Sequence, residues 1–382
     1  MINRLRVKNY KSLKDLDVSL RPLTIFVGPN NAGKSNIIDS LLLMTELLNQ
    51  GAGAVHGRGG FPDIVWNSEL SRSISIVVDG DLELQRKKRR FTYELGLVGG
   101  PQHFALNKEN FTVFDNHEAR PLMKWDSQRL GVDIFDEQSR QMVGFSGDLN
   151  QSFLRHATSS PDRFGAVGQF AKALSEWSSY DPDTLRTRTP SEARRVLRLE
   201  ERAENLSSVL HTLQTEFPSH FTRLKETLKI IVPELLDLYT PLTEQGRTLV
   251  KMNEEGLSMP IPLWALSDGT IHSLGILTAL HVPSPPGLMC FEEPENYVHP
   301  RVLQVLAEAF KDASFRSQIL ITTHSPYFLD CFTPADVVVV EKAKGSTQAK
   351  RASRRKGIRA ALEALGLGEA WYAGSIGGVP EP

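Results

Sequence analysis

The chain has 382 residues, which is enough for one large domain or two modest ones with a sizeable core. Hydrophobic residues make up 40% and charged residues 23%, the composition of an ordinary globular protein. The formal net charge of −1 excludes a uniformly basic nucleic-acid binder but leaves room for local basic patches.

The two cysteines, Cys290 and Cys331, belong to no CxxC pair, so neither a disulfide framework nor a zinc site is expected. The N-terminus lacks the apolar stretch of a signal peptide. No run of the sequence approaches the roughly 20 apolar residues that span a bilayer. We therefore expect a soluble, cytoplasmic protein with no membrane partner.

The N-terminal part of the chain predicts three short strands followed by a helix. Apolar residues alternate or cluster over the three predicted strands, which are residues 2–10, 14–20 and 23–28. The third run ends in glycine, as suits a buried strand before a tight turn. Isoleucines and leucines at helical spacing predict a helix from Lys34 through Leu47.

The middle of the chain is harder to interpret. The Gly-rich residues 51–62 are expected to form a loop, and alternation in 74–78 and 91–97 predicts a β-hairpin. Residues 98–190 have no sustained period, so mixed short elements are expected there. Apolar residues return at helical spacing over 191–236, where two prolines punctuate the predicted helices.

An α/β pattern resumes after Pro262. The expected elements are strands at 288–291, 318–322 and 337–340, with helices at 300–311 and 357–365. Buried strands that alternate with helices indicate a parallel sheet.

The strongest motif is the segment Gly28–Ser35, GPNNAGKS, which fits G-x-x-x-x-G-K-[ST]. It lies between a predicted strand and a predicted helix, which a chance Gly-rich turn would not explain. Backbone N–H groups and the helix N-terminus supply partial positive charge to bound phosphates. Lys34 is expected to reach the β- and γ-phosphates, and the Ser35 hydroxyl to bind Mg²⁺.

A second motif joins an apolar strand to the acidic residues Glu292, Glu293 and Glu295. Strands of this kind aim a carboxylate at a metal from the carboxyl edge of the sheet. Glu292 is predicted to be the metal-side acid and Glu293 the base that orients water. An acidic loop after a core strand is the simpler interpretation of this segment alone, but its place downstream of a phosphate loop favours the functional one.

Two weaker motifs complete the set. Ser267 and Gly269 precede an apolar helix and would offer donors to a γ-phosphate, although taken alone they are explained better by an ordinary Ser N-cap. His324 follows a predicted buried strand and could contact a γ-phosphate or the attacking water, although a lone histidine more often packs or caps a turn. The order of the four motifs is more specific than any one of them.

In this order the chain resembles the RecF/SMC-like ABC-type ATPases, and more closely their short bacterial AAA-family branch, the overcoming-lysogenization-defect-like ATPases. The matching stretches are NYKSL at 9–13, VGPNNAGKSNIID at 27–39, ENLSSVLHTL at 204–213, ALSDGT at 265–270, FEEPENYVHP at 291–300 and TTHSPYFLD at 322–330.

The resemblance implies an α/β P-loop NTPase fold of the ABC-ATPase head type. A mixed sheet would be flanked by helices, with a β-hairpin region and a helical insertion between Walker A and the signature. The expected parts are an N-terminal ATPase lobe at 1–97, an inserted mixed or helical region at 98–260 and a C-terminal ATPase lobe at 261–382.

The resemblance also implies ATP and Mg²⁺ as ligands. The residues expected to bind ATP are Asn30, Asn31, Ala32, Gly33, Lys34 and Ser35, with Ser267 and Gly269 of the signature acting on the nucleotide of the opposite subunit. The expected metal ligands are Ser35 and Glu292. The expected catalytic residues are Lys34, the catalytic glutamate Glu293 and the switch histidine His324. A homodimer is then part of the mechanism, and Glu295, Asn296 and His299 fall where the family places a dimer-contacting loop.

Two positions depart from the pattern. Glu292 stands where many relatives have Asp, and Asp268 stands where transporter heads have Gly. The second departure and the long spacing between phosphate loop and signature disfavour an ABC transporter subunit. Few residues follow Pro326, so no Toprim nuclease domain of the larger relatives is expected in this chain, and a separate effector protein is expected instead.

Two basic runs are candidates for contact with nucleic acid, although solvated loops explain them as simply. They are Arg86–Arg90 and the C-terminal set Lys342, Lys344, Lys350, Arg351, Arg354, Arg355, Lys356 and Arg359.

We therefore expect a Mg²⁺-dependent ATPase that forms an ATP-sandwich homodimer. It would act as a nucleotide-gated switch in DNA repair or anti-phage defence and control a separate effector, for example a nuclease. The alternative is a slow-turnover scaffold that ATP locks together. Assembly beyond a dimer is left open.

Overall fold

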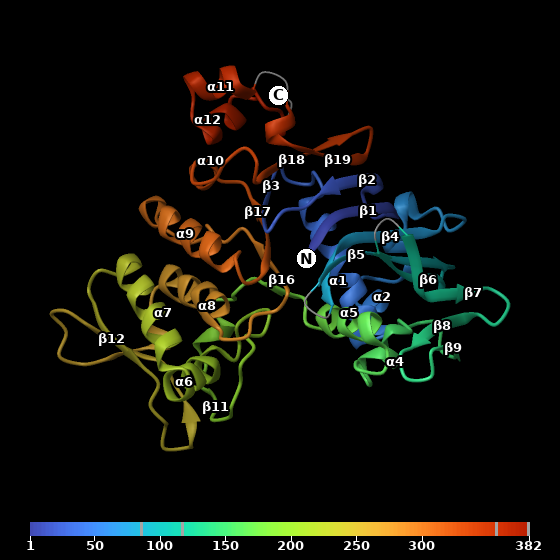
Figure 1. The fold of residues 1–382 in the computed structure, drawn as a ribbon. Coiled ribbons are helices and arrows are strands. Elements are labelled where there is room, and N and C mark those ends of the chain that lie inside the picture. The colour runs from blue at the N-terminus through green and yellow to red at the C-terminus, as the bar shows by residue number, and fades with distance from the viewer. Residues whose placement is uncertain (85–86, 116–117, 356–357, 380–382) are drawn as a thin grey trace.

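The computed structural model describes residues 1–84, 87–115, 118–355 and 358–379. A β-rich lobe and a helical lobe flank a central sheet (Figure 1). The central sheet has the strand order β10-β16-β17-β3-β18-β19. Its strands are β10 (Ser178–Tyr180), β16 (Leu288–Glu292), β17 (Gln318–Thr323), β3 (Leu23–Val27), β18 (Val337–Ala343) and β19 (Ser346–Arg351).

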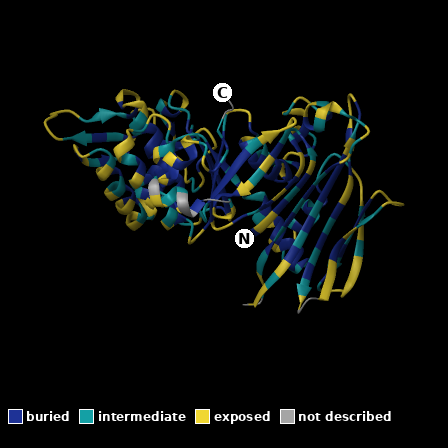
Figure 2. Cartoon of the chain, turned by 90° about the horizontal axis from the view of Figure 1, so that it is seen from above, coloured by how far each residue is buried: buried dark blue, intermediate teal, exposed yellow. Residues whose placement is uncertain are grey.

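The first five strands of this sheet are parallel, and β19 pairs antiparallel with β18. Successive side chains of β3 enter opposite cores, Ile25 with the helical lobe and Phe26 with the β-rich lobe. The same alternation holds in β16, where Cys290 packs in the core of the β-rich lobe and Phe291 in the core of the helical lobe. A sheet buried on both faces explains why these strands are continuously apolar, and Figure 2 shows the burial along them.

The β-rich lobe is built on an antiparallel sheet in the order β2-β1-β4-β5-β6-β7-β8-β9. The strands are β1 (Ile2–Tyr10), β2 (Leu13–Ser19), β4 (Ile74–Leu84), β5 (Lys87–Gly99), β6 (Phe104–Asp115), β7 (Glu118–Asp126), β8 (Gly131–Asp136) and β9 (Gln141–Ser146). Three helices pack between the two sheets or on their edges: α1 (Lys34–Asn49), α4 (Leu154–Thr158) and α5 (Gly165–Ser175).

The helical lobe covers the other face of the central sheet. Its main helices are α6 (Leu206–Glu216), α7 (Pro218–Ile231), α8 (Asp268–His281) and α9 (Leu303–Ala313). It also holds two small sheets, formed by β11 (Ser191–Glu192) with β13 (Arg247–Thr248), and by β12 (Leu235–Tyr239), β14 (Lys251–Glu254) and β15 (Ile261–Pro262). Three short helices follow β17 in the chain: α10 (Pro326–Leu329), α11 (Ile358–Ala364) and α12 (Leu367–Tyr372).

The strands predicted at both ends of the chain are confirmed, as are the helix after the phosphate loop and the hairpin, whose strands β4 and β5 are longer than predicted. The expectation of mixed short elements over 98–190 is wrong for residues 104–146, because β6–β9 continue the antiparallel sheet. Their outer faces mix polar and apolar residues and the β6 pairings are bulged, so no clean alternation appears in the sequence. The expectation is confirmed for the remainder, which holds α4, α5, β10 and a 3₁₀ turn.

Three other predictions need correction. The loop expected at 51–62 contains two four-residue helices, α2 (Gly53–His56) and α3 (Phe61–Ile64). The helical stretch expected from residue 191 begins only at Leu206, because Leu199 is buried from a loop rather than from a helix. The helix predicted at 300–311 opens as a 3₁₀ turn, Pro300–Val302, before α9.

The division at residues 97 and 260 stays a prediction, although strand pairing crosses both boundaries, from β5 to β6 and from β10 to β16. Within the described ranges, every helix is too short or too polar to cross a membrane.

Candidate nucleotide-binding and hydrolysis site

The phosphate loop connects β3 to α1, and its backbone is shaped for an anion. Gly33 has φ of 100°, and a Cβ there would lie 2.1 Å from the Thr347 hydroxyl, so only glycine fits. Among the described residues no side chain caps the N-terminus of α1. The first N–H groups of the helix therefore stay available to a phosphate.

Lys34 is buried beneath this loop. Its ammonium donates to the carbonyls of Gly28 and Pro29, at 3.0 and 3.2 Å, and lies 2.7 Å from His324 Nε2. Burial lowers the pKa of Lys34 to about 8, against the opposing charges of nearby glutamates. The lysine has three donors, and each of them faces one of these acceptors.

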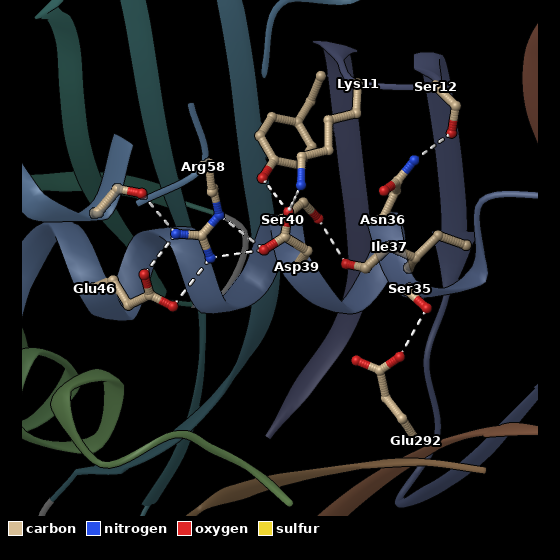
Figure 3. A network of polar contacts seen from close by, with 12 residues as sticks. Lys11, Ser12, Ser35, Asn36, Ile37, Asp39, Ser40, Glu46, Arg58 and Glu292 are labelled. Atoms are coloured by element: carbon tan, nitrogen blue, oxygen red, sulfur yellow. Dashed lines mark hydrogen bonds and ion pairs between the residues drawn. The ribbon is translucent and has the colours of Figure 1, made fainter. Parts of the chain in front are cut away.

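Ser35 and Glu292 meet at the carboxyl edge of the central sheet. The register of β16 on β17, and of β17 on β3, brings the end of the acidic strand level with the start of the phosphate loop. The Ser35 hydroxyl donates to Glu292 Oε2 at 2.8 Å (Figure 3). A hydroxyl and one carboxylate suit Mg²⁺, which takes oxygen ligands from the protein and completes its shell with water and substrate phosphates.

His324 joins Lys34 to the second glutamate. Its Nε2 lies 3.0 Å from Glu293 Oε1 as well as 2.7 Å from the lysine. Burial, and then the Lys34 charge, lower the pKa of His324. One ring nitrogen cannot accept from the ammonium and donate to the carboxylate at the same time, so the two contacts are alternatives. Glu293 is held in the left-handed region, at φ of 45°, where its N–H donates to the Thr322 carbonyl.

Glu295 holds the backbone of His324 in place through a hydrogen bond. Its Oε1 accepts from the Thr323 hydroxyl and, at 3.1 Å, from the His324 N–H. Its Oε2 is buried and has no partner among the described residues, and burial raises the pKa of this carboxyl. The sequence placed Glu295 in a dimer-contacting loop. The structure turns its carboxylate inward, whereas Asn296 and His299 are exposed.

The signature residues lie apart from this cluster. The Ser267 hydroxyl caps α8 by accepting from the Thr270 N–H at 3.2 Å, so the simple N-cap interpretation holds locally. A Cβ on Gly269 would lie 2.5 Å from the Tyr297 carbonyl, so the signature packs against the loop that follows β16. Within the described ranges no hydrogen bond joins Ser267 or Gly269 to the phosphate loop of the same chain.

Two sets of contacts that the sequence did not reveal hold α1 and the phosphate loop, respectively. Figure 3 shows Arg58 bridging Asp39 and Glu46 along α1, with Nε 2.8 Å from Asp39 Oδ1 and Nη2 3.0 Å from Glu46 Oε1. From β19, the Thr347 hydroxyl donates to the Ala32 carbonyl at 2.8 Å and lies 2.7 Å from Ser12 Oγ. Neither set has a local sequence signal, because its members are far apart in the chain.

Several residues of the two basic runs form ion pairs or hydrogen bonds within the chain. In the first run Arg86 lies outside the described residues, and Lys88 and Arg89 pair with Asp81 and Asp115. In the second, Arg351 donates to backbone carbonyls. Arg355 pairs with Glu341, and the structure does not describe Lys356 or the side chain of Arg359. Lys342 and Lys344 are exposed.

The phosphate loop follows β3, the carboxylates lie at the end of β16 and the histidine follows the strand between them, and the fold is that of an ABC-type ATPase head. The family model described as "AAA domain, putative AbiEii toxin, Type IV TA system" matches residues 23–330, and the chain belongs to this family. The family model is that of an AAA domain.

Two curated relatives are nucleases by name. The chain is 25% identical over 345 residues to the OLD nuclease of Thermus scotoductus, covering 86% of this chain and 60% of that protein. It is 22% identical over 372 residues to the Old nuclease of Escherichia phage P2, covering 92% of this chain and 61% of that protein. The chain thus spans less than two thirds of either relative's length.

Solved structures agree on the fold. An Smc head bound to the C-winged helix domain of ScpA superposes with a TM-score of 0.59 at 13% identity, covering 91% of this chain and 97% of that one. At this identity the likeness concerns the fold alone.

Proposed function

We propose that the chain binds and hydrolyses ATP with Mg²⁺ and that two copies close around two nucleotides. The observation that carries this proposal is the 2.7 Å contact between Lys34 and His324. It joins the phosphate loop to the strand end where Glu293 also lies, so that the groups needed to hold a triphosphate and to activate water converge at one sheet edge.

Each residue of the site has a proposed role in binding or hydrolysis. Asn30 to Ser35 wrap the phosphates with backbone N–H groups, and Lys34 binds the β- and γ-phosphates. Ser35 and Glu292 would hold Mg²⁺, which when bound neutralises charge on the phosphate oxygens. Glu293 orients the attacking water and accepts its proton.

The shared nitrogen of His324 makes this site responsive to the nucleotide. A triphosphate offers Lys34 anionic acceptors in place of His324, because the lysine has only three donors. Once released, His324 Nε2 is free to take a proton and to donate to the γ-phosphate or to Glu293. Loss of the γ-phosphate on hydrolysis would return the lysine to the histidine and reset the site.

The homodimer follows from the separation of signature and phosphate loop. Ser267 and Gly269 lie at the N-terminus of α8, and the first N–H groups of a helix can donate to an anion. Because they do not contact their own phosphate loop, we propose that they bind the γ-phosphate held by the partner copy. Nucleotide binding then favours the closed dimer, and hydrolysis reopens it.

We further propose that the dimer controls an effector in DNA repair or anti-phage defence. Two relatives are named nucleases, so a nuclease on a separate chain is the effector that we favour. The exposed lysines Lys342 and Lys344 are candidates for contact with nucleic-acid phosphates.

The test combines size-exclusion chromatography and light scattering on Glu293→Gln, with and without ATP and Mg²⁺, with wild-type hydrolysis. We expect ATP to convert a monomer into a dimer, and the wild type to turn over. If the protein stays monomeric with ATP, the assignment of Ser267 and Gly269 fails and a plain nucleotide binder remains. A dimer already present without ATP would indicate a constitutive scaffold.

A second candidate function is an assembly that ATP locks together with little turnover. Glu292, which contacts the Ser35 hydroxyl directly, stands in place of the usual aspartate, and this departure permits slow turnover. Slow hydrolysis with tight ATP binding would support this candidate, and a turnover of several per second would exclude it.

A further inference from the structure

Arg188, which lies between the phosphate loop and the signature in the sequence, donates three hydrogen bonds to the signature segment. Arg188 ends a 3₁₀ turn, Arg186–Arg188. Its Nη1 donates to the carbonyls of Trp264 and Leu266, at 2.6 and 2.9 Å, and its Nη2 donates to Asp268 Oδ1 at 2.6 Å. A single guanidinium thus holds the backbone just before the signature and the carboxylate within it.

The arginine is itself held in place. Asp183 organises the turn, because its carboxylate accepts from the N–H groups of Leu185 and Arg186 at 2.9 and 3.1 Å. The Thr187 hydroxyl donates to the Asp183 carbonyl at 2.6 Å. The Arg188 side chain is 22% exposed, against 64% for Arg186 in the same turn. Little side-chain entropy is then left to lose when the signature engages a ligand.

The same segment starts at the edge of the nucleotide site. Strand β10 pairs in parallel with β16, and Tyr180 is level with Phe291. Asp181 therefore leaves the sheet beside Glu292, the proposed metal-side acid. Only a short turn separates this point from Arg188, so residues 181–188 connect the site of one nucleotide to the surface proposed to meet the other.

The contact also explains how an aspartate is tolerated in the signature. A free carboxylate at the first residue of α8 would repel an arriving γ-phosphate. Arg188 supplies the opposite charge at hydrogen-bond distance, and it holds the pKa of Asp268 below its ordinary range.

We propose that Arg188 is the positioning residue of the signature: it holds the backbone of Ser267–Gly269 in the conformation that binds the partner's nucleotide and offsets the charge of Asp268. This inference rests on the proposed function, because it requires the ATP-dependent dimer. It assigns to Arg188 no contact with the nucleotide of its own subunit.

The first test measures dimerisation in the Glu293→Gln background with ATP and Mg²⁺, comparing Arg188→Ala with the matched control Arg186→Ala. For Arg188→Ala we expect the dimer dissociation constant to rise about tenfold or more, because a charge-assisted contact to the signature is lost. Binding of a fluorescent ATP analogue to the monomer should stay within about twofold of the parent in both variants. The control should dimerise like the parent, since among the residues that the structure describes Arg186 pairs with Asp183 and Glu204 on the surface and not with the signature.

The second test separates positioning in trans from a defect in folding. Arg188→Ala and Glu293→Gln are each expected to hydrolyse ATP poorly, but a mixed dimer of the two contains one complete site. That site has the phosphate loop and Glu293 of the first chain and the intact signature of the second. Mixing should therefore restore hydrolysis above the sum of the separate variants.

Two results would overturn the inference: unchanged dimerisation of Arg188→Ala, or no recovery on mixing although both variants bind ATP. If Arg188→Ala unfolds, Arg188→Lys and Asp268→Asn replace it, and thermal melting with monomer ATP binding verifies their fold. If the parent protein never dimerises with ATP, the proposed function fails instead, and the two failures are thereby distinguished.

Discussion

At the scale of single residues, the central feature of the site is one nitrogen of His324 that two neighbouring groups approach. Lys34 has three donors, and His324 contributes one ring nitrogen that both Lys34 and Glu293 approach. Lys34 and Glu293 therefore compete for one ring nitrogen. Under the proposed function, this competition is what would make the site respond to a triphosphate.

Glu292 provides a test at this scale. In Glu292→Asp the carboxylate is withdrawn by one methylene, about 1.5 Å, so it would reach less far toward a Mg²⁺ ion held by the Ser35 hydroxyl. We expect the Mg²⁺ concentration for half-maximal hydrolysis to rise about fivefold, as for loss of ~1 kcal/mol. Magnesium titration of ATP hydrolysis measures this. Glu308→Asp on the exposed face of α9 is the control, and an unchanged or lower magnesium requirement in Glu292→Asp would remove Glu292 from the metal site.

At the scale of secondary-structure elements, a buried carboxylate ties the β-rich lobe to its helices. Glu109 on β6 is fully buried, and among the described residues no Lys or Arg pairs with it. Its oxygens accept from the Tyr93 hydroxyl at 2.7 Å, from the Ser152 hydroxyl at 2.5 Å and from the Phe153 N–H at 2.8 Å. The last two donors lie just before α4, so one side chain fixes that helix against the sheet.

Replacing this carboxylate should destabilise the lobe. Glu109→Ala leaves three buried donors without an acceptor, and each such group costs about 1–3 kcal/mol. We expect the free energy of unfolding to fall by ~3 kcal/mol in urea titrations. Glu94→Ala on β5 is the control, because its partly exposed ion pair with Lys108 contributes less than about 1 kcal/mol. Equal effects of the two substitutions would contradict the role of Glu109.

The same carboxylate predicts a pH dependence. Burial raises the pKa of Glu109, so the folded protein binds this proton more tightly than the unfolded chain. Its contribution to stability is complete below the unfolded pKa, about 4.3, and is lost as pH rises through the folded pKa. The stability difference between wild type and Glu109→Ala should therefore be larger at pH 5 than at pH 7. Urea titrations at both values measure it, and a difference that shrinks on acidification would contradict the prediction.

The elements that sequence patterns predicted are those whose burial is regular. Strands β3, β16 and β17 are apolar throughout because both faces of the central sheet are covered, and β1 alternates because it faces one core. Strand β6 was missed: it places the buried Glu109 inside the lobe and carries outward apolar residues. A charged residue in a core position cancels the pattern that would have identified the strand.

The site residues that lie in short sequence motifs were predicted, and those defined by contacts with distant residues were not. Lys34, Ser35, Glu292, Glu293 and His324 were predicted because each lies in a short motif at a strand end, and the structure brings them together. Thr347 and Arg188 were missed, because their importance lies in what they contact, far away in the sequence. A single sequence contains no record of such pairs.

At the scale of the whole molecule, both ends of the chain meet at the phosphate loop. Thr347 near the C-terminus supports Ala32, and Ser12 near the N-terminus bonds both Thr347 and Asn36 of α1. Thr347 lies in the hairpin of β18 and β19, and the tip of this hairpin carries the exposed Lys344. A ligand on that hairpin would therefore act on a segment that touches the nucleotide site directly.

Thr347 tests this connection. Thr347→Val removes the hydroxyl that supports the loop, and we expect ATP affinity to fall about fivefold, equivalent to ~1 kcal/mol for one buried hydrogen bond. Titration with a fluorescent ATP analogue measures the affinity. Thr347→Ser keeps the hydroxyl and should bind ATP nearly as the wild type does. If the valine and serine variants bind alike, the hydroxyl does not support the loop.

The strand order of the central sheet also has a consequence for synthesis. Strand β3 ends at Val27, but its two neighbours, β17 and β18, begin only at Gln318 and Val337. At 5–20 residues per second, the ribosome needs roughly 15–60 seconds to reach them. Until then an apolar strand that will be central has no partner on either side, and the loop after it has no backing. The nascent chain must wait, exposed to chaperones and to misfolding, until the residues from Gln318 onward emerge and complete the sheet behind the phosphate loop.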